Sequence, residues 1–395
     1  MPNRNPNNSE YRDETLLILN TTSYLLEATE QTTQETNASL TGHVDLCEPE
    51  PQDKYKTDQR IQILKDEKKL LENNLTAYRE ILNYMLDALR NTPYPGVENY
   101  TRYTMARLGV HSLSSAEQLK PEIGPVINDV LFFRYRLSVP PCQNVTANRS
   151  VFIAVISAPY NFDRRHMIRQ TWLNHLKVMK SDSLMGLSGF AFILGLTENN
   201  MTQNMIDDES KTFGDVIQIE MSDFYRNLSL KVAGLLNWLS RNCASVDFVM
   251  KVDDDVYVNV RNLAHFVQSF HPSNQSIFGT SAAPFIPNRG NFKLITRKYA
   301  FGITHCIDTL WSNTLIDGRW AITFEEWPWS QYPPYFMGPA VLMPQSTILP
   351  LLAASQSTPM MPFDDLYLTG MCTEKAGIKL LFSTNSFRYV IVFVF

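Results

Sequence analysis

The stretch Asp247–Asn259, "DFVMKVDDDVYVN", decides the fold class of this chain and raises the question of its chemistry. Its first half is a short apolar run of the kind that forms a strand buried on both faces of a sheet. Three consecutive acids, Asp253, Asp254 and Asp255, follow that strand, although burying like charges without partners is costly. Acids at a strand end indicate either a solvated turn or a cation site.

Similar apolar runs occur on the N-terminal side of this stretch. Strands are predicted at 151–157, 189–196 and 215–221, with helices between them. The predicted apolar helix faces are Ile168, Trp172, Leu176 and Met179 in one helix and Leu228, Val232, Leu235 and Leu239 in another. This alternation predicts an α/β domain with a largely parallel central sheet. Ligands of such sheets bind at the carboxyl ends of the strands, where the three acids lie.

Composition indicates the compartment and the class of partner. The net charge of −5 over 395 residues gives no electrostatic support to a nucleic-acid partner. Ten Asn-X-Ser/Thr triplets occur where chance gives roughly four, which favours the secretory pathway. Glycans are predicted at Asn37, Asn74, Asn99, Asn144 and Asn148.

The cysteines and the N-terminus bear on the same question. Five cysteines in that compartment predict disulfides with one thiol left over, which we assign to Cys47 in its polar segment. The sequence shows neither a signal peptide nor a run of about 20 apolar residues. The triplet count favours the secretory pathway, but a secretory protein needs a signal peptide or an anchor. We therefore expect that the chain lacks its N-terminal segment.

Composition changes divide the chain into four regions. Residues 1–54 are polar and are predicted to be disordered and rich in glycosylation sites. Residues 55–92 carry apolar positions alternately three and four apart, which is typical of a helical stem. That stem is either a coiled coil that forms a homodimer or an amphipathic helix packed on the main domain. Residues 93–140 are predicted to be a linker, and 141–395 the catalytic domain.

The acids have a chemical use if they bind a cation. In an extended chain Asp253 and Asp255 point to one side and Asp254 to the other. Two carboxylates on one side can hold Mn²⁺, or Mg²⁺, and leave coordination positions for diphosphate oxygens. An EF-hand is excluded because neither its glycine nor its final Glu follows at the required spacing. The solvated acidic turn remains the alternative.

Several blocks together resemble the β-1,3-galactosyltransferase family (glycosyltransferase family 31), which includes β-1,3-N-acetylglucosaminyltransferases. The blocks are "FIAVISAPYNFDRRHMIRQTW", "FILGL", "ESKTFGDVIQIEMSDFYRNLSLKV", "CASVDFVMKVDDDVYVNV", "YPPYFMGPAVLM" and "FDDLYLTGMC", within residues 132–382. The resemblance implies the GT-A nucleotide-diphospho-sugar transferase fold and an inverting enzyme. It also implies a UDP-sugar donor, a glycan acceptor on a glycoprotein or glycolipid, Mn²⁺, and a Golgi location behind a type II membrane anchor, which is missing here.

The resemblance also assigns the reacting groups. Asp253 and Asp255 match the metal-binding acids of the family, and Asp365 matches the base that activates the acceptor hydroxyl. The alternative for Asp365 is a helix N-cap. Asp364 stands where the family usually has Glu and is assigned to the acceptor.

The donor side rests on charged residues before and within the quoted stretch. Arg165 and Arg169 are predicted to contact the nucleotide or its phosphates, with structural ion pairing as the alternative. Lys251 and Asp254 are assigned to the donor as well, although Lys251 alternatively pairs with the acids.

The acceptor side is predicted from aromatics. Trp329, Tyr332 and Tyr335 are expected to stack on sugar faces, with burial in the core as the alternative. Phe336 stands where the family has Gly, which leaves the acceptor geometry open. We predict galactosyl transfer; N-acetylglucosaminyl transfer and an inactive carbohydrate-binding member are the alternatives.

Overall fold

The computed structural model describes residues 62, 65, 69, 87–145, 149–179, 185–270, 275–289, 320–382 and 390–393. The chain divides into two compact units. The smaller unit contains residues 1–92, 99–111 and 323–330, and the larger contains 93–98, 112–322 and 331–395. The predicted disordered region 1–54 and most of the predicted stem lie outside the described residues, so the homodimer stays a prediction.

Helices and strands alternate along much of the described chain, and most of α3 belongs to the smaller unit. The helices are α3 (Val97–Leu108), η1 (Pro121–Ile123), α4 (Phe162–Gln170), α5 (Trp172–Met179), α6 (Asn200–Phe213), η3 (Tyr225–Asn227), α7 (Leu228–Asn242), α8 (Val260–Ser269), η5 (Gln345–Thr347), α10 (Ile348–Ser357), the π-helix η6 (Leu366–Cys372) and α11 (Thr373–Lys375). The strands are β1 (Tyr135–Leu137), β2 (Ser150–Ile156), β3 (Gly186–Leu196), β4 (Val216–Ser222), β5 (Phe248–Asp253), β6 (Val256–Val258), β7 (Ser276–Ser281), β8 (Phe336–Pro344), β9 (Lys379–Phe382) and β10 (Ile391–Phe393).

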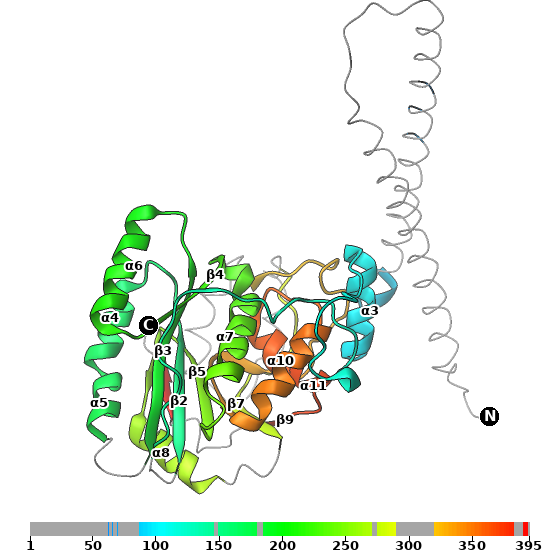
Figure 1. Cartoon of the computed structure of the whole chain (residues 1–395). Helices are drawn as coiled ribbons and strands as arrows, with labels where there is room; N and C mark the ends of the chain where they lie inside the picture. Colours follow the sequence, from blue (N-terminus) through cyan, green and yellow to red (C-terminus); the bar gives the residue numbers. More distant parts are fainter. Residues whose placement is uncertain are drawn as a thin grey trace, which may run out of the picture. The chain divides into compact units, whose positions relative to one another are not determined.

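An eight-stranded sheet in the order β1-β4-β3-β2-β5-β8-β7-β9 forms the centre of the larger unit (Figure 1). Strands β4, β3, β2 and β5 are parallel neighbours, β1 and β8 run antiparallel to them, and β7 and β9 run with them. The predicted α/β class with a mostly parallel sheet is confirmed. Because β2, β4 and β5 are parallel, the residues that follow them meet at one edge of the sheet.

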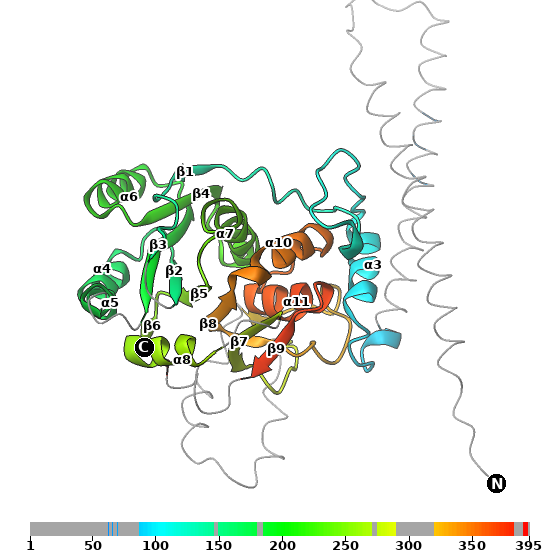
Figure 2. The ribbon, with the colours of Figure 1, turned by 60° about the horizontal axis from the view of Figure 1, so that its bottom comes forward.

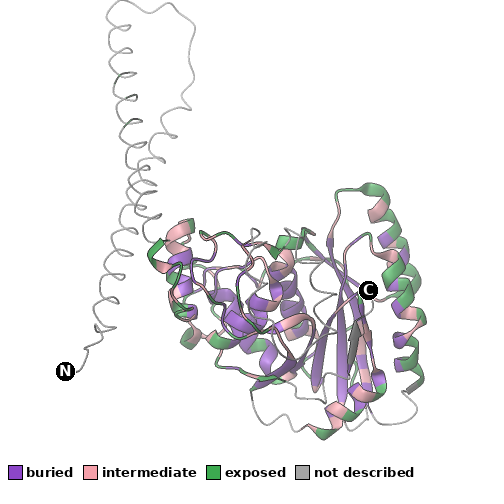
Figure 3. Ribbon diagram, turned by 180° about the vertical axis from the view of Figure 1, so that it is seen from behind, coloured by how far each residue is buried: buried purple, intermediate pink, exposed green. Residues whose placement is uncertain are grey.

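The sheet is buried by helices on both faces, as its apolar strands predict (Figure 2). Every residue of β2 is buried. Alternate β2 side chains pack with buried residues of α4, α5 and α8 in one apolar core. On the other face Phe152 contacts Trp238 of α7, with ring centroids 5.4 Å apart. The buried strands and the buried sides of the helices face one another, and the exposed residues lie on the outer helix surfaces (Figure 3).

Local sequence sets several helix ends. The Asn199 side chain accepts a hydrogen bond from the Thr202 amide at the start of α6, and Gly214 ends that helix at a φ of 63°. Asn259, the last residue of the opening stretch, accepts from the Asn262 amide and caps α8. The single helix predicted around Ile168 is wrong in one respect, because the chain breaks at Thr171 and forms α4 and α5.

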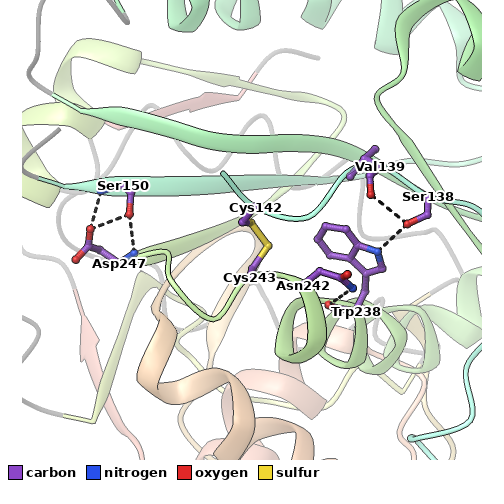
Figure 4. Close-up of a disulfide and its surroundings, with 8 residues drawn as sticks. All are labelled: Ser138, Val139, Cys142, Ser150, Trp238, Asn242, Cys243 and Asp247. Carbon is purple, nitrogen blue, oxygen red and sulfur yellow. Dashed lines mark hydrogen bonds between the residues drawn. A yellow bond between two sulfur atoms is a disulfide. The ribbon is translucent and has the colours of Figure 1, made fainter. Parts of the chain in front are cut away.

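A disulfide between Cys142 and Cys243 joins the segment before β2 to the end of α7 (Figure 4). Its sequence separation is 101 residues, so in the chain-entropy view it stabilises by restricting a long loop in the unfolded chain. Cys372 is a free, buried thiol. The expectation that Cys47 is the cysteine left over lies outside the described residues, but the free Cys372 was not foreseen.

The smaller unit has an aromatic core of its own. Trp327 lies 5.2 Å from the Tyr100 ring and 5.2 Å from the Trp329 ring, centroid to centroid. Tyr103 packs against Trp329 and donates its hydroxyl hydrogen bond to the Glu325 carbonyl at 2.8 Å. These rings bury one another instead of facing solvent.

The structure adds detail to the predicted linker and glycan sites. The segment 93–140, predicted as a linker, contains α3 and the sheet strand β1. Among the predicted glycan sites, Asn144 is exposed on irregular backbone, whereas Asn99 lies partly buried within α3. Asn37, Asn74 and Asn148 lie outside the described residues.

Within the described part of the chain, no helix has the length and apolar character needed to cross a membrane.

Candidate active site

Carboxylates from two distant segments meet around one buried ammonium group. The Lys251 Nζ lies 3.1 Å from the Asp253 carboxylate and 2.8 Å from that of Asp364, and it donates to the Gly338 carbonyl at 2.9 Å. We call Lys251, Asp253, Asp364 and Asp365 the acid cluster. Burial lowers the pKa of Lys251, but the two carboxylates more than offset it and hold the side chain charged.

This geometry corrects the role predicted for Lys251. An ammonium group has three hydrogens, and all three have protein acceptors. The side chain is also 2% exposed, so it does not reach a donor phosphate. Lys251 lies within the otherwise apolar strand β5, and its burial there is compensated by the two carboxylates that it pairs with.

The three consecutive acids have three different surroundings. Asp253 is partly buried and faces Lys251. Asp254 turns back into the protein, where it accepts from Ser157 at 2.7 Å and from Asn161 at 2.8 Å. The side chain of Asp255 is 52% exposed. The predicted donor role of Asp254 is therefore wrong: its oxygens are occupied by protein donors that tie β5 to the segment after β2.

Arg164, which the sequence prediction did not name, contacts two of the three consecutive acids. Its guanidinium contacts Asp254 at 2.7 Å and Asp255 at 3.5 Å while the side chain stays 51% exposed. The signal was in the helix spacing, because Arg165 and Ile168 lie three apart and form the buried face of α4. Arg164, next to that face, keeps access to solvent.

Arg165 and Arg169 take part in a different structure. Arg165 is fully buried and pairs with Glu209 at 2.7 Å; Arg169 pairs with Glu209 at 2.7 Å and with Asp215 at 2.7 Å. We call these four residues the ion-pair network. Burial raises the pKa of Glu209, but the two guanidinium groups outweigh it and lower the pKa overall. The predicted donor contact of Arg165 and Arg169 is wrong, since their hydrogens bind acids inside the protein and Arg165 has no exposure.

Asp365 lies at the start of a π-helix, a rare form that is frequent at functional sites. One carboxylate oxygen accepts from the Leu366 amide at 2.7 Å, so the predicted capping contact exists. The other lies close to Gly338, where an added Cβ would be 3.5 Å from it. Burial raises the pKa of Asp365 to about 7, and repulsion from Asp364 adds to this effect. A carboxylate with that pKa is suited to accept a proton near neutral pH.

The predicted acceptor aromatics are mostly core residues. Trp329 is 3% exposed in the smaller unit, and Tyr332 is 7% exposed. Tyr332 packs edge-on against Tyr335, with centroids 6.0 Å apart. Stacking of sugars on Trp329 and Tyr332 is therefore wrong, because neighbouring side chains cover their faces. Tyr335 is partly exposed; burial raises the pKa of its phenol, and the charge of Asp365 adds to this effect.

Phe336, the departure from the family's glycine, is fully buried at the start of β8. Gly279 of the neighbouring strand makes room for it, since a Cβ there would lie 2.5 Å from the Phe336 ring. The absence of a side chain at Gly279 thus accommodates the Phe336 ring within the sheet.

Few side chains of the site could coordinate a cation. In the described ranges, no three or more His, Cys, Asp or Glu side chains form a group that could hold a metal ion. Asp255 and the free oxygen of Asp253 offer two hard oxygen donors, which suit Mn²⁺ or Mg²⁺ when substrate oxygens and water supply the remaining ligands. The residues fit a cation that binds together with a diphosphate.

A comparison with protein families decides the relationship. The model of the family described as Galactosyltransferase matches residues 163–382, which include the acid cluster. The chain belongs to the galactosyltransferase family. The matched residues extend from the start of α4 to the end of β9, so they also contain the ion-pair network.

Several curated relatives resemble this member of the family. The human acetylgalactosaminyl-O-glycosyl-glycoprotein β-1,3-N-acetylglucosaminyltransferase is 28% identical over 69% of this chain and 65% of its own length. Human β-1,3-galactosyltransferase 5 is 26% identical over 58% of this chain and 64% of its own. Rat UDP-GlcNAc:βGal β-1,3-N-acetylglucosaminyltransferase 7 is 30% identical over 58% and 52%. The chain thus spans somewhat less than two thirds of the length of these relatives.

Among solved structures, the WbbM bifunctional glycosyltransferase matches 61% of this chain and 40% of its own, with 9% identity and a TM-score of 0.30. A likeness this weak carries no argument.

Proposed function

We propose that this family member transfers a hexose from a UDP-sugar to a hydroxyl group of an acceptor sugar, with inversion to a β-1,3 linkage. The observation that carries the proposal is the acid cluster at the carboxyl edge of the sheet, in which Asp365 has a pKa near neutrality and Asp253 is followed two residues later by the exposed Asp255. Galactose is the donor sugar we put first. The names of the human and rat β-1,3-N-acetylglucosaminyltransferases favour N-acetylglucosamine as the second candidate.

The residues divide the chemistry between them. Asp365 takes the proton of the acceptor hydroxyl as that oxygen attacks the anomeric carbon. Asp253 and Asp255 hold a divalent cation, Mn²⁺ first, which on binding would neutralise charge developing on the leaving diphosphate. Arg164, rather than Arg165 or Arg169, is the guanidinium with access to the diphosphate.

The compartment is proposed on similar grounds. The disulfide between Cys142 and Cys243 and the exposed triplet at Asn144 support the secretory pathway, and the names of the relatives support its glycan-building part. We propose the Golgi lumen.

The test is a donor screen with purified full-length protein. UDP release is measured from UDP-galactose and UDP-N-acetylglucosamine with Mn²⁺, with nitrophenyl glycosides of galactose, N-acetylglucosamine and N-acetylgalactosamine as acceptors. We expect Asp255→Asn to raise the Mn²⁺ concentration needed for half-maximal rate at least tenfold, and Arg164→Met to raise the donor KM. If the wild-type protein releases no UDP from either donor, the proposal is wrong.

A further inference from the structure

Two partly exposed aromatic rings form a pair near the acid cluster. Tyr225 opens η3 directly after β4, and its residue is 40% exposed; Trp320 is 39% exposed. The Trp320 indole N–H donates a hydrogen bond to the Tyr225 phenol oxygen. This contact orients both rings, since each has one polar group engaged by the other.

Buried contacts place Tyr225 at the site edge of the sheet. A few residues after it, Lys231 binds Asp223 at 2.6 Å and the Ser157 carbonyl at 3.0 Å. Ser157 in turn donates to Asp254, so this contact ties the segment after β4 to the end of β5. Ser229 donates to the Met361 carbonyl, which joins the start of α7 to the segment that leads into Asp364.

The phenol also experiences the charges of the acid cluster. Burial raises the pKa of Tyr225 to about 12, and among the carboxylates Asp365 contributes most, followed by Asp364 and Asp253. The carboxylates of the acid cluster thus lie within electrostatic range of the phenol, in agreement with the contacts that tie its segment to the residues around Asp254 and Asp364.

Such a pair has the properties of a sugar platform. The C–H face of a pyranose packs on aromatic rings, while a phenol hydroxyl can bond to sugar hydroxyl groups. The aromatics that were predicted to do this, Trp329 and Tyr332, are buried. Tyr225 and Trp320 keep part of their faces open and are held against each other, so little freedom is lost on binding.

We propose that Tyr225 and Trp320 form the platform on which the acceptor sugar ring rests while its hydroxyl group faces Asp365. The inference rests on the proposed function and adds the residues that select the acceptor. The donor diphosphate is placed at the other part of the site, by Asp255 and Arg164. The platform therefore acts on acceptor binding, not on donor binding.

The test compares Trp320→Ala and Tyr225→Phe with the parent protein. For Trp320→Ala we expect the acceptor KM to rise roughly tenfold, as the loss of a well-placed aromatic contact does, with the donor KM unchanged. Tyr225→Phe removes only the phenol hydroxyl group and keeps the ring, so it should raise the acceptor KM less than Trp320→Ala does. Phe132→Ala is the matched control, because Phe132 is 73% exposed in the segment before β1 and should change neither constant. Circular dichroism checks that each variant is folded.

A second measurement does not depend on turnover. Saturation-transfer NMR records binding of the three nitrophenyl glycosides to the full chain, and we expect the signal to be lost in Trp320→Ala and kept in Phe132→Ala. A parent protein that binds glycoside but releases no UDP would overturn the proposed function and leave the platform standing. Equal glycoside signals in parent and Trp320→Ala, including none in either, would overturn the platform. A rise in donor KM alone would overturn its assignment to the acceptor.

Discussion

The acid cluster and the ion-pair network both bury charged groups near the same edge of the sheet, and they differ in charge balance. In the network, Arg165 and Arg169 face Glu209 and Asp215, so two positive charges meet two negative ones with contacts of 2.7 Å. In the acid cluster, the single ammonium of Lys251 pairs with Asp253 and Asp364, and Asp365 adds a third carboxylate. A balanced group needs nothing further, whereas an unbalanced group stays costly until a cation or a proton arrives. Charge imbalance therefore separates the site from the scaffold.

The strongest test of this comparison is Asp365→Asn. If Asp365 accepts the proton, the variant should lose roughly 10²–10⁴-fold in transfer rate, because the amide cannot act as a base. Donor affinity, measured by calorimetry with UDP, should be unchanged, since the change leaves the Asp255 side intact. Near-normal turnover in this variant would place the base elsewhere in the cluster.

Arg165→Met tests the balanced side of the comparison. We expect the free energy of unfolding to fall by about 3–5 kcal/mol, because Glu209 loses a buried partner. Arg164→Met, in the same helix but 51% exposed, is the matched control and should cost less than about 1 kcal/mol. Urea unfolding of both variants makes the measurement. A stable Arg165→Met protein with a raised donor KM would return Arg165 to the donor site.

A third prediction uses pH to separate the two groups. The folded-state pKa of Asp365, about 7, lies above its unfolded value near 3.8, so ionisation costs stability as the pH rises between these values. Asp365→Asn removes this cost and should be more stable than the parent above pH 7. After discounting for partial exposure we expect a gain on the order of 1–2 kcal/mol, shrinking towards zero near pH 4.

Denaturant unfolding of parent and variant at pH 4.5, 6 and 8, with chelator to remove cations, gives that difference. A stability gap that stays constant over this range would show that Asp365 is ionised throughout in the folded protein. The balanced network predicts no matching gain for Glu209→Gln, because the pKa of Glu209 is lowered and its charge is stabilising at neutral pH.

The smallest effect is expected for a charge pair that is neither buried nor part of a site. Asp208 and Lys211 on α6 lie 3.0 Å apart with both side chains about three quarters exposed. Asp208→Asn should leave stability and transfer rate unchanged within error, since solvent already screens the pair. A measurable loss in either quantity would mean that burial is not what distinguishes the charged groups of this protein.

Much of the fold was predictable because it follows from local patterns. The apolar runs at 151–157, 189–196 and 215–221 each became a strand, and their parallel order follows from the helices between them. The break at Thr171 and the strand β1 were not predictable. The short β1 gains its stability from pairing with β4, a partner far along the chain.

The site was predictable in part, and the errors share a cause. The sequence placed Asp253, Asp255 and Asp365 among the candidates, and the structure shows Asp253 and Asp365 in one cluster with Lys251. The sequence also predicted Arg165 in the donor-binding site. In the structure, Glu209, 44 residues away, binds that guanidinium inside the protein. The predicted stacking of a sugar on Trp329 is wrong for the same reason, since Tyr103 and Trp327 pack against its ring.

Residue order was enough to predict the types of most strands and helices, the position of the acids at a strand end and the resemblance to the family. These depend on side-chain periodicity and on residue identity, which the chain carries locally. The tertiary structure alone decided which charges are compensated and which aromatic faces stay open. That decision depends on partners brought from distant segments, because burial and hydrogen bonding belong to pairs of residues, not to single positions.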